Sequence, residues 1–131
     1  MAARYDIIRS FEDRYHFRLM IATRVLLIGG EKASLALCRA SISSVRLICD
    51  APLEDCLGLL GEPGKELGFP KYKIERRGRG TWTVYLFAKN GRCVAQTPPF
   101  STSGAALDTL EAIKRTARYG MINDEIGGIK K

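Results

Sequence analysis

The sequence predicts an α+β fold in which two β-β-β-α repeats pack into one pseudo-symmetric domain, with the helices on one face of an antiparallel sheet. Three observations predict it. The two halves of the chain match at an offset of 67 residues, each half has three short segments typical of strands, and a helical pattern follows each third segment. The length of 131 residues suits one domain, or two small repeats that share a core.

The first repeat is assigned to residues 4–49. Its strands are expected around Tyr5 to Arg9, around Tyr15 to Leu19 and at residues 25–28. A helix is expected over residues 34–48, where apolar residues recur at helical spacing. Ser34 precedes that pattern, and its hydroxyl is suited to capping the helix by accepting a backbone N–H.

The second repeat is assigned to residues 71–118. Its strands are expected around Tyr72 to Arg76, at residues 81–87 and at residues 92–96, and Asn90-Gly91 favours a tight hairpin turn between the last two. Leu107, Leu110 and Ile113 predict its helix, which Thr102 is expected to cap. The residues that match between the repeats are Tyr5 with Tyr72, Ile7 with Ile74, Arg9 with Arg76, Tyr15 with Trp82, Phe17 with Val84, and Leu19 with Leu86.

Two segments lie outside the repeats. Residues 50–70 form an acidic, Leu-rich linker, in which Leu53, Leu57 and Leu60 would share the face of a short helix. Residues 119–131 form a C-terminal tail, for which an ordered extension and a frayed end both stay open. A unit of three strands and one helix has a marginal core, so we expect the two repeats to complete each other.

The order and duplication of these motifs resemble the YegP-like family of small bacterial proteins. The second copy supplies Tyr72-Lys73-Ile74, Trp82 to Leu86, Ala88-Lys89-Asn90-Gly91 and Leu110 to Ile113; the first supplies Tyr5-Asp6-Ile7, Tyr15 to Leu19 and Ile42 to Val45. The first copy lacks Asn-Gly, Pro98-Pro99 precedes the second helix, and the linker is long. The resemblance implies the β-β-β-α fold, and it carries no catalytic residue with it.

The residue types argue against an enzyme and against a metal or other cofactor. Cys38, Cys49, Cys56 and Cys93 form no Cys-x-x-Cys pair, and His16 is the sole histidine, so zinc and cysteine-protease chemistry lack their usual ligands and bases. The thiols are expected to be buried and free. His16 with Arg18, Glu12 and Asp13 is the best catalytic constellation, and it has no nucleophile.

Composition restricts the partners. With 46% hydrophobic and 27% charged residues the chain is typical of a globular protein, and no apolar run approaches the roughly 20 residues of a membrane span, so we expect a soluble, cytoplasmic protein without a membrane partner. The resemblance to YegP-like proteins implies a bacterial or phage origin. The net charge of +7 is unevenly distributed: +4 over residues 4–49, −4 over 50–70, +7 over 71–118 and zero over the tail. The second repeat carries the imbalance.

Strand alternation predicts a basic and aromatic surface on the second repeat. Tyr85 and Phe87 would lie on the sheet face opposite the helix, beside basic residues of the first hairpin and the far turn. Such a surface can bind single-stranded or structured nucleic acid, because cations contact phosphates while bases stack on rings. The candidate binding residues are Lys73, Arg76, Arg77, Arg79, Tyr85, Phe87, Lys89 and Arg92.

Two alternatives stay open. The same aromatic and arginine residues, with the Leu-rich linker, would suit a protein–protein interaction module, such as a small inhibitor or adaptor of a larger complex. The face with Tyr85 and Phe87 could instead pack against the first repeat, the linker or a second subunit. Both a monomer with pseudo-two-fold repeats and a homodimer paired through sheet edges remain compatible with the sequence.

Overall fold

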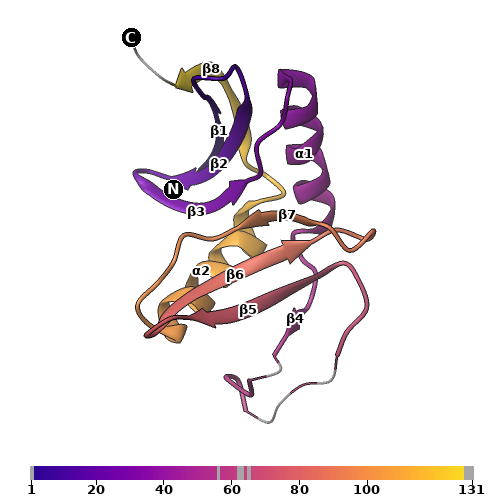
Figure 1. Ribbon diagram of the computed structural model, residues 1–131, viewed down its shortest axis with the longest axis vertical. Coiled ribbons are helices and arrows are strands. Elements are labelled where there is room, and N and C mark those ends of the chain that lie inside the picture. The colour runs from indigo at the N-terminus through magenta and orange to yellow at the C-terminus, as the bar shows by residue number, and fades with distance from the viewer. Residues whose placement is uncertain (1, 56, 62–63, 65, 129–131) are drawn as a thin grey trace.

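The computed structural model describes residues 2–55, 57–61, 64 and 66–128, with side chains as far as Asn123. In this part of the chain one eight-stranded sheet packs with two helices, and the strand order is β4-β5-β6-β7-β3-β2-β1-β8 (Figure 1). The elements are β1 (Ala3–Arg9), β2 (Tyr15–Ile21), β3 (Arg24–Gly29), α1 (Leu35–Ile48), β4 (Leu53–Glu54), β5 (Lys71–Arg77), β6 (Thr81–Phe87), β7 (Cys93–Gln96), α2 (Ser103–Thr116) and β8 (Met121–Gly128).

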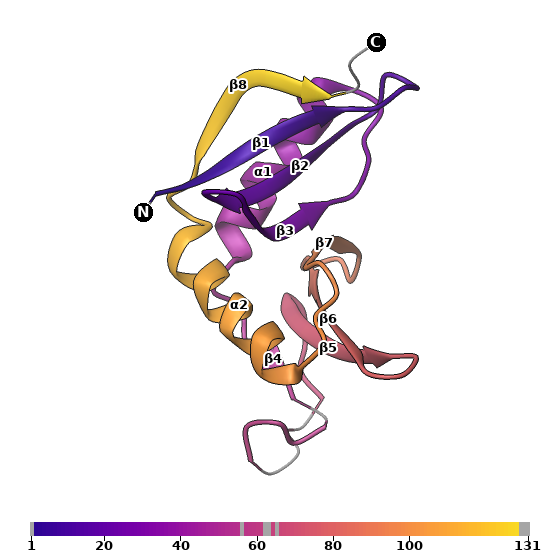
Figure 2. The same ribbon diagram turned by 90° about the vertical axis from the view of Figure 1, so that its left-hand side faces the viewer.

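Two antiparallel three-stranded units meet in the middle of the sheet. Within them β1 pairs with β2 and β2 with β3, and β5 pairs with β6 and β6 with β7. The units join where β3 pairs with β7 through Ile28 opposite Gln96 and Gly29 opposite Ala95. Figure 2 shows the two units turned relative to each other about this short junction.

The sheet is mixed, so the prediction of an antiparallel sheet is wrong in this respect. After each helix the chain returns to the sheet as a strand that was not predicted, and it pairs in parallel with the first strand of the other unit. β4 pairs with β5, and β8 pairs with β1. A strand that follows a helical crossover can run parallel to its neighbour, whereas the hairpins within each unit enforce antiparallel pairing.

Both helices start where the sequence predicts them. The Ser34 hydroxyl accepts a hydrogen bond from Leu37 N–H at 3.1 Å, and the Thr102 hydroxyl accepts one from Ala105 N–H at 3.1 Å. Helix α1 contacts β2 and β7, and α2 contacts β3 and β6, so each helix packs on strands from both units. Figure 1 shows α1 running along the upper strands and down past β7.

One hydrophobic core lies between the helices and a single face of the sheet, which we call the inner face. Tyr5, Phe17 and Leu19 from the first unit and Tyr72 and Leu86 from the second are fully buried in it. Alternation then directs the intervening side chains to the opposite side of the sheet, which we call the outer face. The predicted division of β5 and β6 between two faces is therefore observed, with Trp82 half-buried on the inner side.

Several local expectations differ from the structure. The described residues of the linker contain β4 and turns in the place of the short helix through Leu53, Leu57 and Leu60. Of the two alternatives for the tail, the ordered extension is observed as far as Gly128, where it forms strand β8. Cys38 and Cys49 are buried free thiols as expected, Cys93 is exposed, and Cys56 lies outside the described residues. Neither α1 nor α2 is long and apolar enough to span a membrane.

Candidate nucleic-acid interface

The outer face of β5 and β6 brings four of the predicted binding residues together. In the pairing of β5 with β6, Lys73 lies opposite Tyr85. Arg77 is an even number of positions along β5 from Lys73, and Phe87 is an even number along β6 from Tyr85. Successive side chains of a strand point to opposite faces, so these four share the face that the helices leave uncovered. The hairpin between β5 and β6 holds them at fixed separations.

Each of the two rings has a cation beside it. The Arg77 guanidinium lies 5.7 Å from the centroid of the Tyr85 ring, and the Lys73 Nζ lies 5.8 Å from that of Phe87. Such pairs are weakly attractive and orient the basic group over the ring. Tyr85 and Phe87 are half-buried, so part of each ring is open to solvent. Among the described residues the Phe69 ring is the aromatic neighbour of Phe87, with centroids 5.9 Å apart.

The other four candidate residues lie elsewhere. Arg76 is on the inner side of β5, with its guanidinium 5.8 Å from the centroid of the Trp82 ring. Arg79 is exposed in the turn between β5 and β6, and Lys89 and Arg92 are exposed at the turn between β6 and β7. The eight predicted residues therefore do not form one surface. Four of them share the outer face, three lie in the turns at the two ends of the strands, and Arg76 lies on the inner face.

The outer face continues across the sheet into the first unit. The strand registers place one residue from each strand in a transverse row: Glu54, Lys73, Tyr85, Gln96, Ile28, Arg18, Asp6 and Asn123. Arg18 and Gln96 are exposed, whereas Asp6 forms an ion pair with Arg4 at 3.1 Å and accepts a hydrogen bond from Asn123. The sequence pattern predicts this surface on the second unit alone. The pairing of β3 with β7, which extends the surface, joins segments that are far apart in the sequence and produces no local pattern.

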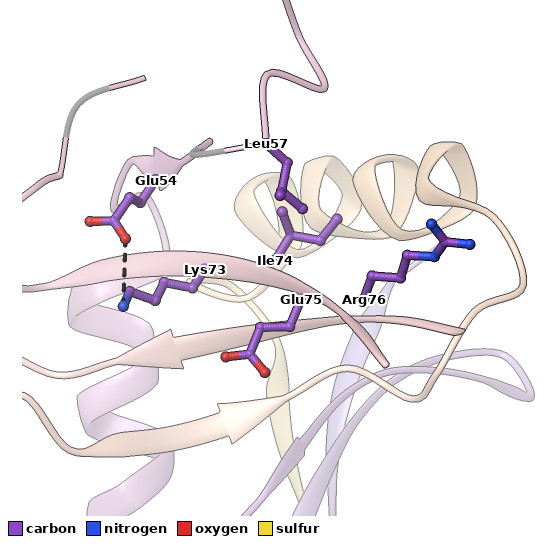
Figure 3. A pocket seen from close by; sticks show the side chains of 6 residues that line it. All are labelled: Glu54, Leu57, Lys73, Ile74, Glu75 and Arg76. Atoms are coloured by element: carbon purple, nitrogen blue, oxygen red, sulfur yellow. Dashed lines mark ion pairs between the residues drawn. The ribbon is translucent and has the colours of Figure 1, made fainter. Parts of the chain in front are cut away.

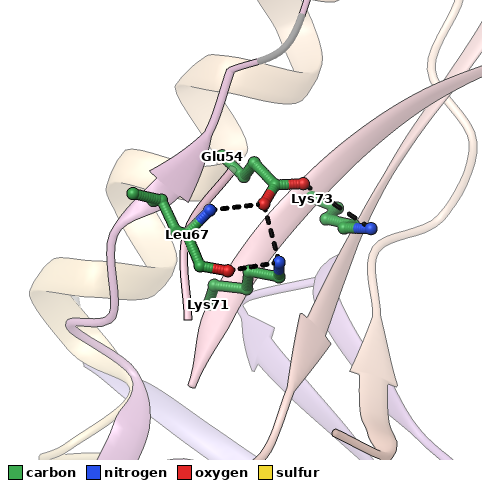
Figure 4. A network of polar contacts seen from close by, with 4 residues as sticks. All are labelled: Glu54, Leu67, Lys71 and Lys73. Carbon is green, nitrogen blue, oxygen red and sulfur yellow. Dashed lines mark hydrogen bonds and ion pairs between the residues drawn. The ribbon is translucent and has the colours of Figure 1, made fainter. Parts of the chain in front are cut away.

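A buried ion pair supports the start of β5 and was missed at the sequence level. The Lys71 Nζ donates to Glu54 Oε1 at 2.6 Å and to the Leu67 carbonyl at 2.6 Å, and Leu67 N–H also donates to Glu54 at 2.8 Å (Figure 4). The side chains of Lys71 and Glu54 are 2% and 4% exposed. Lys71 therefore is not part of the exposed basic surface, in contrast to what its position in a basic run indicates.

The same carboxylate positions Lys73. Glu54 Oε2 lies 3.5 Å from the Lys73 Nζ, which places that ammonium between Glu54 and the Phe87 ring. The hydrogen bond from Lys71, followed by that from Leu67 N–H, lowers the pKa of Glu54 to about 2. Glu54 is thus ionised at neutral pH and neutralises part of the positive charge of the hairpin.

A cavity of about 360 Å³ lies along the edge of β5 that faces away from β6. Four consecutive β5 residues from Lys73 to Arg76 line it, together with Glu54 and Leu57 (Figure 3). In Figure 3 the Leu57 and Ile74 side chains face each other, and Glu54 pairs with Lys73 at one end. The cavity therefore has an apolar middle between charged groups.

The constellation around His16 carries no obvious chemistry. His16 is half-buried on β2, and burial followed by the nearby Arg18 charge lowers its pKa. Its Nδ1 atom is buried without a hydrogen-bond partner among the described residues. No three His, Cys, Asp or Glu side chains gather as metal ligands in the part of the chain that the structure describes.

Comparisons with known proteins identify the fold. No family model matches the chain, and no curated protein matches it. The solution NMR structure of a UPF0339 protein from Shewanella oneidensis is similar, with a TM-score of 0.74, 16% identity, and coverage of 94% of this chain and 91% of that chain. The solution NMR structure of the yegP protein from E. coli, whose function is unknown, gives a TM-score of 0.73 and 16% identity over 97% of this chain and 96% of that chain.

Both similarities extend over nearly the whole chain. At 16% identity they establish the architecture, α+β with a large mixed sheet and two helices among the described residues. The resemblance to YegP-like proteins, predicted from the tyrosine, aromatic and Asn-Gly motifs, is confirmed at the level of the fold. A shared fold does not define a shared activity, so the function has to be argued from the surface itself.

Proposed function

We propose that this chain, which has the YegP-like fold, is a non-enzymatic cytoplasmic module that binds single-stranded nucleic acid on the outer face of β5 and β6. The observation that carries the proposal is the cluster of Lys73, Arg77, Tyr85 and Phe87, two partly open rings with a cation beside each. Phosphates would contact the cations, and bases would stack on the rings.

The exposure of Arg77 supports this use. The Arg77 side chain is 68% exposed, and its nearest carboxylate, Glu75, is 3.8 Å away. Such an exposed ion pair is weak, so Arg77 can turn to a phosphate while a base takes its place over Tyr85. Arg79, Lys89 and Arg92 lie at the two ends of the hairpins, where they can contact the backbone of a strand that crosses the face.

The proposal is tested by fluorescence anisotropy with a labelled single-stranded oligonucleotide of about ten nucleotides at ~50 mM salt. Tyr85→Ala should weaken binding about fivefold or more because a stacked base is lost, and Tyr85→Phe should retain it. Arg77→Ala should weaken binding and make the negative slope of log affinity against log salt shallower by about 0.7, because one phosphate contact is lost.

Arg115→Ala is the charge-matched control, because Arg115 is exposed on α2 and away from the outer face. It should change affinity little. The proposal fails if the protein binds no oligonucleotide below tens of micromolar, or if Arg115→Ala and Arg77→Ala have equal effects.

We also infer that the two halves are structural repeats related by pseudo-two-fold symmetry. In the first half Tyr5 pairs with Leu19, and in the second Tyr72 pairs with Leu86, both shifted by 67 residues. Each half continues as hairpin, third strand, capped helix and a strand that pairs with the other half. This relationship makes differences between the halves informative.

A further inference from the structure

The edge of strand β5 is covered only at its beginning. Leu53 and Glu54 of β4 pair with Tyr72 and Lys73, and within the described residues no strand pairs with this edge from Ile74 onward. The reason lies in Asp55, whose carboxylate accepts hydrogen bonds from Leu59 N–H at 2.9 Å and Leu60 N–H at 2.8 Å. These bonds turn the chain away from the sheet directly after β4.

The corresponding edge in the other half is covered further. Strand β8 pairs with β1 at Arg4, Tyr5 and Asp6, and again at Ile8 and Arg9, where Gly127 and Gly128 lie opposite. At the offset of 67 residues, Ile8 and Arg9 correspond to Glu75 and Arg76 of β5. β8 therefore pairs with β1 at Ile8 and Arg9, whereas no described strand pairs with β5 at the matching positions, Glu75 and Arg76.

The cavity lies at this uncovered stretch. Its lining includes Ile74, Glu75 and Arg76, with Leu57 as the opposite wall (Figure 3). Leu57 is 55% exposed although it faces Ile74, so the apolar wall is not closed by the described part of the chain. Ile74 is only 6% exposed, so a strand added here would mainly cover Leu57.

Among the described residues, no backbone group pairs with the β5 edge beside this cavity. Tyr72 N–H donates to the Pro52 carbonyl at 2.8 Å, which shows that Tyr72 directs its peptide groups outward, toward β4. Because these directions alternate along a strand, the N–H and C=O of Ile74 and Arg76 also point outward, while those of Glu75 point to β6. Unpaired groups of this kind are a template for another strand.

We propose that the β5 edge from Ile74 to Arg76 binds an extended peptide segment of a protein partner, added as a strand parallel to β5 and in line with β4. Main-chain hydrogen bonds to Ile74 and Arg76 would supply affinity, and alternate side chains would supply selectivity. An apolar residue fits against Leu57 and Ile74. An acidic residue fits near Arg76, whose described neighbour is the Trp82 ring and not a carboxylate.

The charge distribution argues against a second copy of this chain as the occupant. If two β5 edges met antiparallel around a two-fold axis, an axis at Glu75 would set the Glu75 residues of both copies opposite each other, and an axis at Arg76 would do the same for the Arg76 residues. Like charges directly opposite in a sheet are destabilising. The cavity shares Lys73 with the outer-face cluster proposed for nucleic acid, but Tyr85 and Phe87 are not among the residues that line it.

The experiment uses the full chain and the fluorescein-labelled peptide Val-Thr-Glu-Thr-Val-Thr-Glu-Thr, in which Val and Glu follow each other on one face of a strand, as Ile74 and Arg76 do on β5. The same peptide with Lys in place of each Glu is the charge control. Amide hydrogen exchange of the unmodified protein is measured by NMR with and without the peptide. Saturable binding of the Glu peptide, with slower exchange at the Ile74 and Arg76 amides and weaker binding of the Lys peptide, is the expected result.

A matched pair of variants isolates the backbone contribution. Arg76→Pro removes the outward N–H, which an edge strand tolerates, while Arg76→Ala removes the charge and keeps the N–H. Arg76→Pro should weaken peptide binding about tenfold, more than Arg76→Ala does, because it loses a main-chain hydrogen bond as well as the charge. Tyr85→Ala, on the outer face, should leave peptide binding unchanged.

Three results would overturn the proposal. The first is an absence of saturable binding at ~1 mM peptide, a concentration above the range expected even for weak recognition. The second is unchanged exchange of the Ile74 and Arg76 amides at saturation, or equal affinity of Arg76→Pro and Arg76→Ala. The third is protection of those amides by the single-stranded oligonucleotide in place of the peptide, which would assign the edge to nucleic acid.

Discussion

At the scale of single residues, the closest packing constraint lies where the two units of the sheet join. Gly29 ends β3 and pairs with Ala95 of β7, and its Cα faces the ring of Phe17. A methyl group at position 29 would overlap that ring, which is fully buried in the core. The neighbouring Gly30 has open space at the same point.

Gly29→Ala should therefore destabilise the protein by about 1–3 kcal/mol through overpacking. Gly30→Ala is the matched control and should change the free energy of unfolding by less than about 0.5 kcal/mol. Urea denaturation followed by circular dichroism measures both. Equal stability of the two variants would contradict the tight packing between β3 and Phe17.

The Glu54–Lys71 ion pair gives the protein a specific response to acid. The pKa of Glu54 is lowered from 4.5 to about 2, first by the hydrogen bond from Lys71. Because the folded value lies below the unfolded one, the pair stabilises the fold above pH 4.5 and loses this contribution as the pH falls toward 2. The melting temperature should drop over this interval.

Glu54→Gln tests this assignment. It should lower the melting temperature at pH 7, because Lys71 stays buried without its carboxylate, and it should flatten the decrease between pH 4.5 and 2. Glu75→Gln is the control, since Glu75 is exposed and 3.8 Å from Arg77, and it should retain the wild-type pH profile. An unchanged profile in Glu54→Gln would refute the role of this pair.

At the scale of elements, the parts predicted from sequence are those that local residues determine. The alternation of Tyr72, Ile74, Val84 and Leu86 predicts hairpin strands, and the hydroxyls of Ser34 and Thr102 mark the helix starts. Strand β4 has two residues, too few to show any alternation, and it exists because Pro52 and Leu53 meet β5. The presence of β4 therefore could not be predicted from a local pattern.

The same distinction explains the partial prediction of the candidate site. Tyr85 and Phe87 were assigned to one face by their spacing, and the structure places Lys73 and Arg77 beside them. Lys71 lies on the same side of β5 as Lys73, but it is buried in an ion pair with Glu54. Glu54 is 17 residues earlier in the sequence, and the pairing of β4 with β5 brings it next to Lys71. Burial by a distant partner leaves no trace in a run of basic residues.

The helix caps give a quantitative test at this scale. Thr102→Ala removes the acceptor for Ala105 N–H and should cost about 1 kcal/mol of stability. Ser101→Ala, at an exposed neighbouring position, is the control and should have little effect. Chemical denaturation compares the two, and an equal change in both variants would show that the cap hydrogen bond is not the cause.

At the scale of the whole molecule, two tyrosines tie the halves together. The Tyr5 hydroxyl, from β1, donates to the Ala117 carbonyl at the end of α2 at 2.5 Å, and the Tyr72 hydroxyl, from β5, donates to the Cys49 carbonyl at the end of α1 at 2.7 Å. Each first strand thus holds the helix of the other half. With α1 on β2 and β7, and α2 on β3 and β6, each helix covers strands of both halves.

The two halves should therefore unfold together, although the junction of the two three-stranded units, between β3 and β7, consists of two residue pairs. Fluorescence of Trp82, in the second half, and far-ultraviolet circular dichroism of the whole chain should give coincident urea transitions. Tyr72→Phe should destabilise by about 1–3 kcal/mol, because a buried carbonyl loses its donor, and it should shift both transitions equally. A shift confined to the Trp82 signal would mean that the halves are independent, and the cross-half hydrogen bonds would then not couple the units.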